Sequence, residues 1–235
     1  MTVVADDDPL VKEEAMLDYV LAHGSANSVS SVIAAIDDFC AQPGQFMMHL
    51  GATKGGHVDA ALVANGTTVY VEFGMYVGYS ALRAAAACPE AKLICIEPHA
   101  GRANIALKVL DFAGVSDRVT WLEGTSGELI PGLKERVEEI VGTPVEAIEG
   151  LSFLIDHVKE AYLPDLQACM DAGLIPEGAV VIADNILFPG APEYREFVES
   201  CEEFDSQFFL SHLENKPHIP DGVLVAKRVS PSAVE

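Results

Sequence analysis

The stretch TTVYVEFGMYVGYSALR, residues 67–83, decides the fold of this chain. Its first seven residues are almost all β-branched or aromatic, which is typical of a strand buried on both faces of a parallel sheet. Gly74 and Gly78 then let the backbone turn tightly, and the residues that follow predict a helix. A strand, a glycine-containing turn and a helix in this order form the first half of a βαβ unit.

Four more short apolar runs follow, separated by stretches with helical periodicity. The runs are AKLICIE (91–97), RVTWLEG (118–124), LSFLID (151–156) and AVVIAD (179–184). One intervening helix has an apolar face made of Ala103, Ala106, Leu107, Leu110 and Ala113. This alternation of strands and helices predicts an α/β fold with a doubly wound, mostly parallel sheet.

The last two apolar runs break the alternation. FDSQFFLSHL (204–213) and GVLVAKRV (222–229) are joined only by ENKPHIPD (214–221), which is too short for a crossover helix. They must therefore pair antiparallel. We expect a seven-stranded sheet, Rossmann-like and mostly parallel, with an antiparallel last strand.

The N-terminal part of the chain reads as helices packed against this sheet. Apolar spacing predicts helices over 10–23, 28–42 and 56–65, with a loop over 42–56 between the last two. We expect a single domain over 1–235, with a flexible acidic segment over 1–9, the extra helices over 10–64, and the sheet with its flanking helices over 67–229.

Composition and charge limit the partners. The 235 residues carry 14 Lys and Arg against 36 Asp and Glu, a formal net charge of -22. Such a surface repels nucleic acid and anionic membranes, so we expect neither as a partner, and no protein partner is evident. A neutral or cationic small molecule is the expected substrate.

The cysteines and the hydropathy of the chain indicate the cellular compartment in which the protein works. Five scattered cysteines without a C-x-x-C pair predict reduced thiols rather than disulfides or a zinc site. The start MTVVADDDPL lacks the basic region of a signal peptide, and no apolar run approaches the ~18 residues of a membrane span. We therefore expect a cytoplasmic protein.

Two strand ends indicate a nucleoside site. Ligands of open parallel sheets bind outside the carboxyl ends of the strands. Glu97 ends the second strand 23 residues after Gly74, close to the spacing at which an acidic side chain binds a ribose diol. The G-x-x-x-G spacing differs from the G-x-G-x-x-G that holds a pyrophosphate, which argues against a nicotinamide-dependent dehydrogenase. S-adenosylmethionine fits both observations, although an ordinary βα turn would explain the glycines alone. Ser126 opens the next helix, either as a ligand contact or as a helix cap.

Two further strand ends carry oxygen ligands. LID ends at Asp156, and IADN ends with Asp184 and Asn185. Two carboxylates and an amide without His or Cys suit Mg²⁺, although each Asp alone could simply cap the following turn. Lys159 lies one helical turn after Asp156, where a nearby cation and partial desolvation would favour the neutral amine, which can act as a base.

Taken in order, these motifs resemble catechol O-methyltransferase. The resemblance rests on EFGMYVGYSALR, VLDFAGVSDRVT, LIDHVKEAYLPD, GAVVIADNILFPGAPEY and SHLE, and extends from about the second helix to the last strand. It implies a class I methyltransferase that transfers the methyl group of S-adenosylmethionine to one hydroxyl of a catechol, with Mg²⁺ chelating both catechol oxygens.

The resemblance also implies roles for individual residues. Lys159 matches the catalytic base, and Asp156, Asp184 and Asn185 match the Mg²⁺ ligands. The substrate site implied by the family comprises Lys159, Asn185, Glu214, Pro189, Phe46 and Val158, with Glu214 holding the second hydroxyl. The implied cofactor site comprises Met48, Leu50, Glu72, Gly74, Tyr76, Ser80, Glu97, Pro98, Gly124, Ser126, Asp156 and His157, with His157 beside the adenine.

The chain departs from the family pattern at four positions. Phe46 and Val158 replace the two tryptophans usual at the gate of the substrate cleft, and a Trp-to-Val change opens one wall. His49 replaces an asparagine, and Gly127 replaces a glutamine. Two alternatives therefore stay open, namely an O-methyltransferase for bulkier vicinal diols such as caffeoyl esters or flavonoids, and a non-catalytic S-adenosylmethionine-binding protein.

Overall fold

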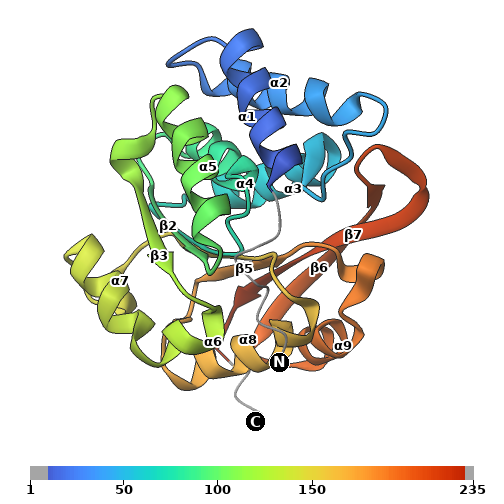
Figure 1. The fold of residues 1–235 in the computed structure, drawn as a ribbon. Coiled ribbons are helices and arrows are strands. Elements are labelled where there is room, and N and C mark those ends of the chain that lie inside the picture. Colours follow the sequence, from blue (N-terminus) through green and yellow to red (C-terminus); the bar gives the residue numbers. More distant parts are fainter. Residues whose placement is uncertain (1–9, 231–235) are drawn as a thin grey trace.

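The computed structural model describes residues 10–230, so the expected flexible segment over 1–9 lies outside the described residues. Seven strands form one sheet in the order β3-β2-β1-β4-β5-β7-β6 (Figure 1). They are β1 (Val69–Phe73), β2 (Lys92–Glu97), β3 (Val119–Glu123), β4 (Leu151–Ile155), β5 (Val180–Ala183), β6 (Phe204–Leu213) and β7 (Lys216–Arg228).

Strand directions follow the expected pattern. β1 pairs parallel with β2 and β4, β2 with β3, and β4 with β5. β7 runs antiparallel to both of its neighbours, β5 and β6. The predicted doubly wound sheet with an antiparallel last strand is confirmed, and the strand order reverses between β1 and β4, where such folds bind ligands.

Helices cover both faces of the sheet and enclose two apolar cores. One face carries α1 (Val11–His23), α2 (Val29–Ala41), α3 (Gly51–Ala64), α4 (Tyr79–Ala87) and α5 (Ala100–Phe112), and the other α6 (Ser126–Leu129), α7 (Leu133–Val141), α8 (Tyr162–Asp171) and α9 (Pro192–Ser200) (Figure 1). β1, β4 and β5 are buried along their whole length because helices exclude water from both sides.

The expected loop over 42–56 is wrong in its second half, because α3 begins at Gly51. Glycines at 55 and 56 lower helix propensity, but tertiary contacts outweigh that cost here. Lys54 is fully buried in ion pairs, and Gly55 leaves room for the Arg83 side chain, whose Nε would lie 2.2 Å from a Cβ at that position.

The expected connection over 214–221 is also mostly strand. β7 begins at Lys216, and a tight turn at Glu214 and Asn215 joins it to β6, with Asn215 in the left-handed region at φ 57°. Pro217 and Pro220 are tolerated because this part of β7 pairs only with β6, whereas β5 pairs from Leu224 onward.

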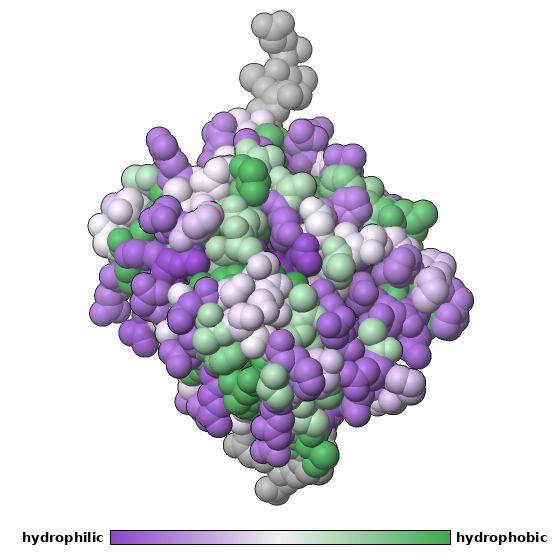
Figure 2. Space-filling model, turned by 90° about the horizontal axis from the view of Figure 1, so that it is seen from above, coloured by the Kyte–Doolittle hydropathy of each residue, from purple (hydrophilic) through white to green (hydrophobic). Residues whose placement is uncertain are grey.

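Hydrophilic side chains cover most of the face seen in Figure 2, as the acidic composition requires. Within residues 10–230, no helix combines the length and apolarity needed to cross a membrane. All five cysteines are free thiols, as predicted.

Candidate active site

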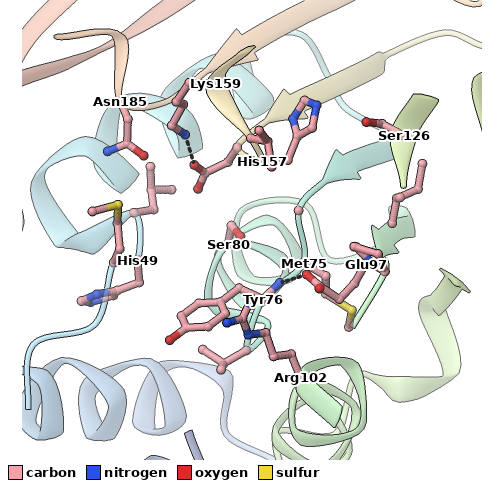
Figure 3. Close-up of a pocket in the computed structure, with 18 of the residues that line it drawn as sticks. His49, Met75, Tyr76, Ser80, Glu97, Arg102, Ser126, His157, Lys159 and Asn185 are labelled. Carbon is pink, nitrogen blue, oxygen red and sulfur yellow. Dashed lines mark hydrogen bonds and ion pairs between the residues drawn. The ribbon is translucent and has the colours of Figure 1, made fainter. Parts of the chain in front are cut away.

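A cavity of 620 Å³ opens at the carboxyl ends of the central strands, where open parallel sheets bind their ligands. Its walls come from the segment before α3, from the residues after β1, β2, β4 and β5, and from the start of α6 (Figure 3). Segments distant in sequence therefore meet at the reversal of strand order. Eight described large apolar side chains are substantially exposed, and Met48 and Val158 among them line this cavity.

The turn after β1 requires glycine because two backbones approach closely. Gly74 has φ 99°, and a Cβ there would lie 2.4 Å from the carbonyl oxygen of Asp156. Tyr76 also adopts a positive φ of 48°, and its ring lies at the cavity wall, with the Arg102 guanidinium 5.4 Å from the ring centroid. The turn thus forms part of the floor of the cavity.

Glu97, the expected ribose ligand, lies at the end of the cavity near α5 (Figure 3). Its carboxylate accepts from the backbone N–H of His99 and of Tyr76, each at 3.0 Å. Burial raises the pKa of Glu97, and these two N–H donors oppose that shift. Each oxygen retains a lone pair for a ligand hydroxyl. Pro98 lines the cavity next to Glu97.

Ser126 and His157 line the same cavity and share one acceptor, Asp165 of α8. His157 Nε2 lies 2.7 Å from Asp165 Oδ2, and the Ser126 hydroxyl donates to the same oxygen. The helix-cap interpretation of Ser126 is wrong, because Thr125 caps α6 together with Glu128. The predicted Gly124 precedes this cap at φ 142° and is not part of the cavity wall.

Glu72 lies behind the cavity wall and reaches it only through Ser80. It is fully buried, and the Ser80 hydroxyl, which lines the cavity, donates to Glu72 Oε1. Burial raises the pKa of Glu72 to about 8, while the hydrogen bonds from Ser80 and Cys95 oppose the shift. Met48 and Leu50 complete this region.

A second group of polar side chains lies at the opposite end of the cavity. Asp156, Lys159 and Asn185 line it together, with Lys159 Nζ 3.2 Å from Asp156 Oδ1 (Figure 3). Lys159 also donates to the hydroxyl of Tyr162, which in turn donates to the backbone oxygen of Asp184 at 3.1 Å. Pro189, after a cis peptide bond, forms the adjacent wall.

Asp184 is buried directly behind this group, at 1% exposure, and is not part of the cavity wall. Lys54 Nζ lies 2.7 and 2.8 Å from its two carboxylate oxygens and 2.8 Å from Asp221 Oδ2. Burial and the Asp156 carboxylate raise the pKa of Asp184, and Lys54 lowers it. Although burial opposes its charge, Asp184 and Asp221 raise the pKa of Lys54. Neither Asp156 nor Asp184 caps a helix.

Neither Glu214 nor Phe46, both expected in the substrate site, is part of the cavity wall. Glu214 sits in the β6–β7 turn with its side chain against Gly51, which follows the cavity residue Leu50, and its buried Oε2 has no hydrogen-bond partner. Lys12 donates to the backbone oxygen of Phe46 at 2.9 Å, and Lys216 Nζ lies 5.3 Å from the centroid of the Phe46 ring.

Sequence reasoning missed three buried polar residues of this region: Lys54, Asp165 and Asp221. Lys54 and Asp221 make their contacts with segments far away in the chain, so no local spacing indicates them. Asp165 contacts the nearby His157 as well as the distant Ser126, and a carboxylate early in a helix does not by itself indicate either contact. The sequence itself gives only a weak indication of Lys54 and Asp221. Lys54 is a lysine in a glycine-rich stretch of a very acidic chain, and Asp221 precedes an apolar strand core.

Comparison with known proteins agrees with this geometry. A family model described as O-methyltransferase matches residues 23–208, most of the chain. The chain belongs to the O-methyltransferase family. It is 38% identical over 204 residues to catechol O-methyltransferase of Bos taurus, covering 86% of this chain and 72% of that protein. A probable O-methyltransferase of Mycobacterium tuberculosis is 38% identical over 215 residues, covering 91% and 90%.

Solved O-methyltransferases share the fold. The tomaymycin-synthesis O-methyltransferase of Streptomyces achromogenes, solved with S-adenosylmethionine, superposes with a TM-score of 0.65 at 17% identity, covering 92% of this chain and 96% of that one. An O-methyltransferase of Bacillus cereus superposes at 0.64 with 18% identity, covering 91% and 90%. Family membership makes this chain an S-adenosylmethionine-dependent O-methyltransferase rather than a nicotinamide-dependent dehydrogenase.

Proposed function

We propose that this O-methyltransferase methylates one hydroxyl of a catechol, with Mg²⁺ held by Asp156, Asp184 and Asn185 and with Lys159 as the base. One observation carries the proposal. Asp156, Lys159 and Asn185 line one end of a continuous cavity whose other end carries Glu97 and Ser126. A methyl donor bound between them would present its methyl group toward the lysine.

The donor set fits a hard divalent cation. The Asp156 carboxylate raises the pKa of buried Asp184, a repulsion that a bound cation would relieve. Asn185 Nδ2 donates to Asp221, so its carbonyl oxygen is left for the cavity. Two carboxylates and one amide oxygen are ligands that Mg²⁺ prefers, with open positions for water and substrate. Bound there, Mg²⁺ would supply Lewis-acid polarisation of the catechol oxygens and a template for their orientation.

The chain's own residues then account for proton and methyl transfer. Lys159 acts as the base and accepts the proton of one catechol hydroxyl at Nζ, while Glu214 Oε2 accepts a hydrogen bond from the other hydroxyl. The oxygen attacks the sulfonium methyl carbon, the carbon–sulfur bond breaks, and its electron pair stays on sulfur as a neutral thioether. Holding the two reactants in line can contribute ~7–11 kcal/mol of the barrier reduction.

Product analysis with a catechol panel tests the proposal. We expect methyl transfer that EDTA abolishes and Mg²⁺ restores. Lys159→Ala should lower kcat on the order of 10²-fold or more, the usual contribution of a positioned base, while S-adenosylmethionine still binds. Lys227→Ala is the control, since Lys227 is an exposed lysine of β7. Full activity in EDTA would contradict the metal assignment, and normal turnover by Lys159→Ala would contradict the base.

A second candidate substrate class is favoured by Val158. This residue lines the cavity beside Lys159 and is 63% exposed, where the family usually has tryptophan. Its small side chain leaves room for bulkier vicinal diols, such as caffeoyl esters or flavonoids. Comparing kcat/KM for a simple catechol and for such compounds distinguishes the two classes, and turnover of either excludes a purely non-catalytic binding role.

A further inference from the structure

Asp221 of β7 is a carboxylate with an unusual number of partners. It is fully buried, and four donors converge on it. Its Oδ2 accepts from Lys54 Nζ at 2.8 Å and from Asn185 Nδ2 at 2.9 Å, while Oδ1 accepts from the backbone N–H of Leu187 at 3.3 Å and of Phe188 at 3.2 Å. Three of these donors belong to the segment that follows β5, and the fourth, Lys54, belongs to α3.

The contact with Asn185 fixes the orientation of an amide. A carboxylate without a proton can only accept hydrogen bonds, so the Asn185 atom that faces Asp221 must be the amino group. The carbonyl oxygen of Asn185 must then point the other way, and Asn185 lines the cavity. Asp221 therefore determines which atom of Asn185 is available to a ligand.

The ammonium of Lys54 balances the charge of the buried Asp221 carboxylate. This ammonium contacts both Asp221 of β7 and Asp184, which follows β5, so one cation from α3 holds carboxylates from two separate segments. An unpaired buried carboxylate would be strongly destabilising, whereas a paired and hydrogen-bonded one is tolerated. The same cation also fixes the direction of Asp184, which precedes Asn185.

We propose that Asp221 is a positioning residue for the acceptor end of the active site. Acting with Lys54, it presents the Asn185 carbonyl oxygen and the 187–188 backbone in the geometry that cation and substrate need. The inference rests on the proposed function, because it assigns to Asp221 the orientation of a proposed Mg²⁺ ligand. Partners that orient metal ligands typically change metal affinity by 10- to 100-fold when they are altered.

Asp221→Asn separates this role from a general structural one. Lys54 retains Asp184 as its partner, so the variant leaves a balanced buried pair and is expected to fold. The new amide has only one oxygen for four donors. Its amino group must therefore face either Asn185, which turns that amide and takes its oxygen out of the cavity, or the N–H groups of Leu187 and Phe188, which displaces the segment that carries Asn185. Asp205→Asn, at an exposed position of β6, is the matched control.

The readout is binding of Mn²⁺, measured by electron paramagnetic resonance in the absence of methyl donor and acceptor. We expect the Kd for Mn²⁺ to rise at least tenfold in Asp221→Asn and to stay within twofold in Asp205→Asn. The Kd for S-adenosylmethionine should stay within twofold in both variants, because Asp221 contacts nothing at the Glu97 end. In Asn185→Ala, adding Asp221→Asn should cost nothing further, since the effect passes through Asn185.

The outcomes separate this inference from the proposed function. Unchanged Mn²⁺ affinity in folded Asp221→Asn, with a wild-type protein that binds Mn²⁺, overturns the positioning role alone. Absence of Mn²⁺ binding in the wild type overturns the metal site and this inference together. If Asp221→Asn does not fold, hydrogen exchange of the Asn185 side-chain amide in the wild type decides the matter. Slow exchange supports the bond to Asp221, and exchange at the rate of a free amide overturns the proposal.

Discussion

The carboxylate of Glu214 fills the space that a side chain at residue 51 would need. A Cβ at Gly51 would lie 2.0 Å from Glu214 Oε2 and 2.4 Å from its Cδ, and Gly51 has φ 74°. The β6–β7 turn can thus pack against the beginning of α3, next to the cavity residue Leu50, because Gly51 has no side chain. A side chain at residue 51 would force the Glu214 carboxylate to move.

Gly51→Ala should therefore displace Glu214 rather than unfold the protein, since the flexible end of the side chain can move. The left-handed backbone adds a cost of roughly 1–2 kcal/mol in stability. We expect KM for the catechol to rise about tenfold, corresponding to about 1.4 kcal/mol for a lost hydrogen bond to a carboxylate. Steady-state kinetics with a catechol measures this change in KM. Gly56→Ala, in the same helix with nothing within 4 Å of its Cβ, is the control. Equal kinetics in the two variants would contradict a role for Glu214.

Asp165 should matter for the methyl donor and not for the acceptor. Its Oδ2 receives both the Ser126 hydroxyl and His157 Nε2, and Asp165→Asn replaces this charged acceptor, which orients two cavity side chains, with the weaker oxygen of a neutral amide. We expect the Kd for S-adenosylmethionine, measured by calorimetry, to rise about tenfold, at about 1.4 kcal/mol, while KM for the catechol is unchanged. Asp171→Asn, at an exposed position of the same helix, serves as the reference. An unaltered Kd would mean that Ser126 and His157 do not contact the donor.

Glu72 should make stability depend on pH. Burial raises its pKa from an ordinary 4.5 to about 8, so the folded protein holds this proton more tightly than the unfolded chain. Its contribution to stability is complete below pH 4.5 and is lost as the pH rises through about 8. Glu72→Gln removes that loss, and its advantage over the wild type in unfolding free energy should grow across this window, reaching on the order of a few kcal/mol. Thermal unfolding from pH 4.5 to 8 measures the difference.

Glu123→Gln, at the exposed end of β3, provides the comparison for that experiment. Because Glu123 is solvated, its substitution should leave the pH dependence of unfolding as it is in the wild type. A constant difference between wild type and Glu72→Gln across the window would show that Glu72 titrates normally.

The strands and most helices were predictable because burial on both faces leaves a continuous apolar run. The residues at strand ends were predictable for a similar reason, since parallel strands deliver their carboxyl ends to one edge. Asp156 and Asn185 do lie at one end of the same cavity. Neither argument requires knowledge of contacts between distant segments.

Lys54 and Asp221 were not predictable on this basis. Their ion pair joins residues 167 positions apart, and both lie in stretches whose glycines or prolines indicate loops. Tertiary contacts turned both stretches into regular structure, α3 and β7, against local propensity. The placement of Asp184 behind the cavity wall likewise follows from Lys54, which no strand-end pattern indicates.

Val158 provides the sharpest test of substrate size. It lines the cavity beside Lys159 with 63% of its surface exposed, so an indole at this position would project over the acceptor end without disturbing the core. Val158→Trp should lower kcat/KM for caffeoyl esters and flavonoids relative to a simple catechol by about tenfold or more, because steric loss of this kind is worth ~1–3 kcal/mol. The ratio of the two kcat/KM values is the measurement. Val63→Trp, a 58% exposed position in α3 outside the cavity wall, controls for an added surface indole. If both variants keep the wild-type ratio, the small residue at 158 does not determine which acceptors enter.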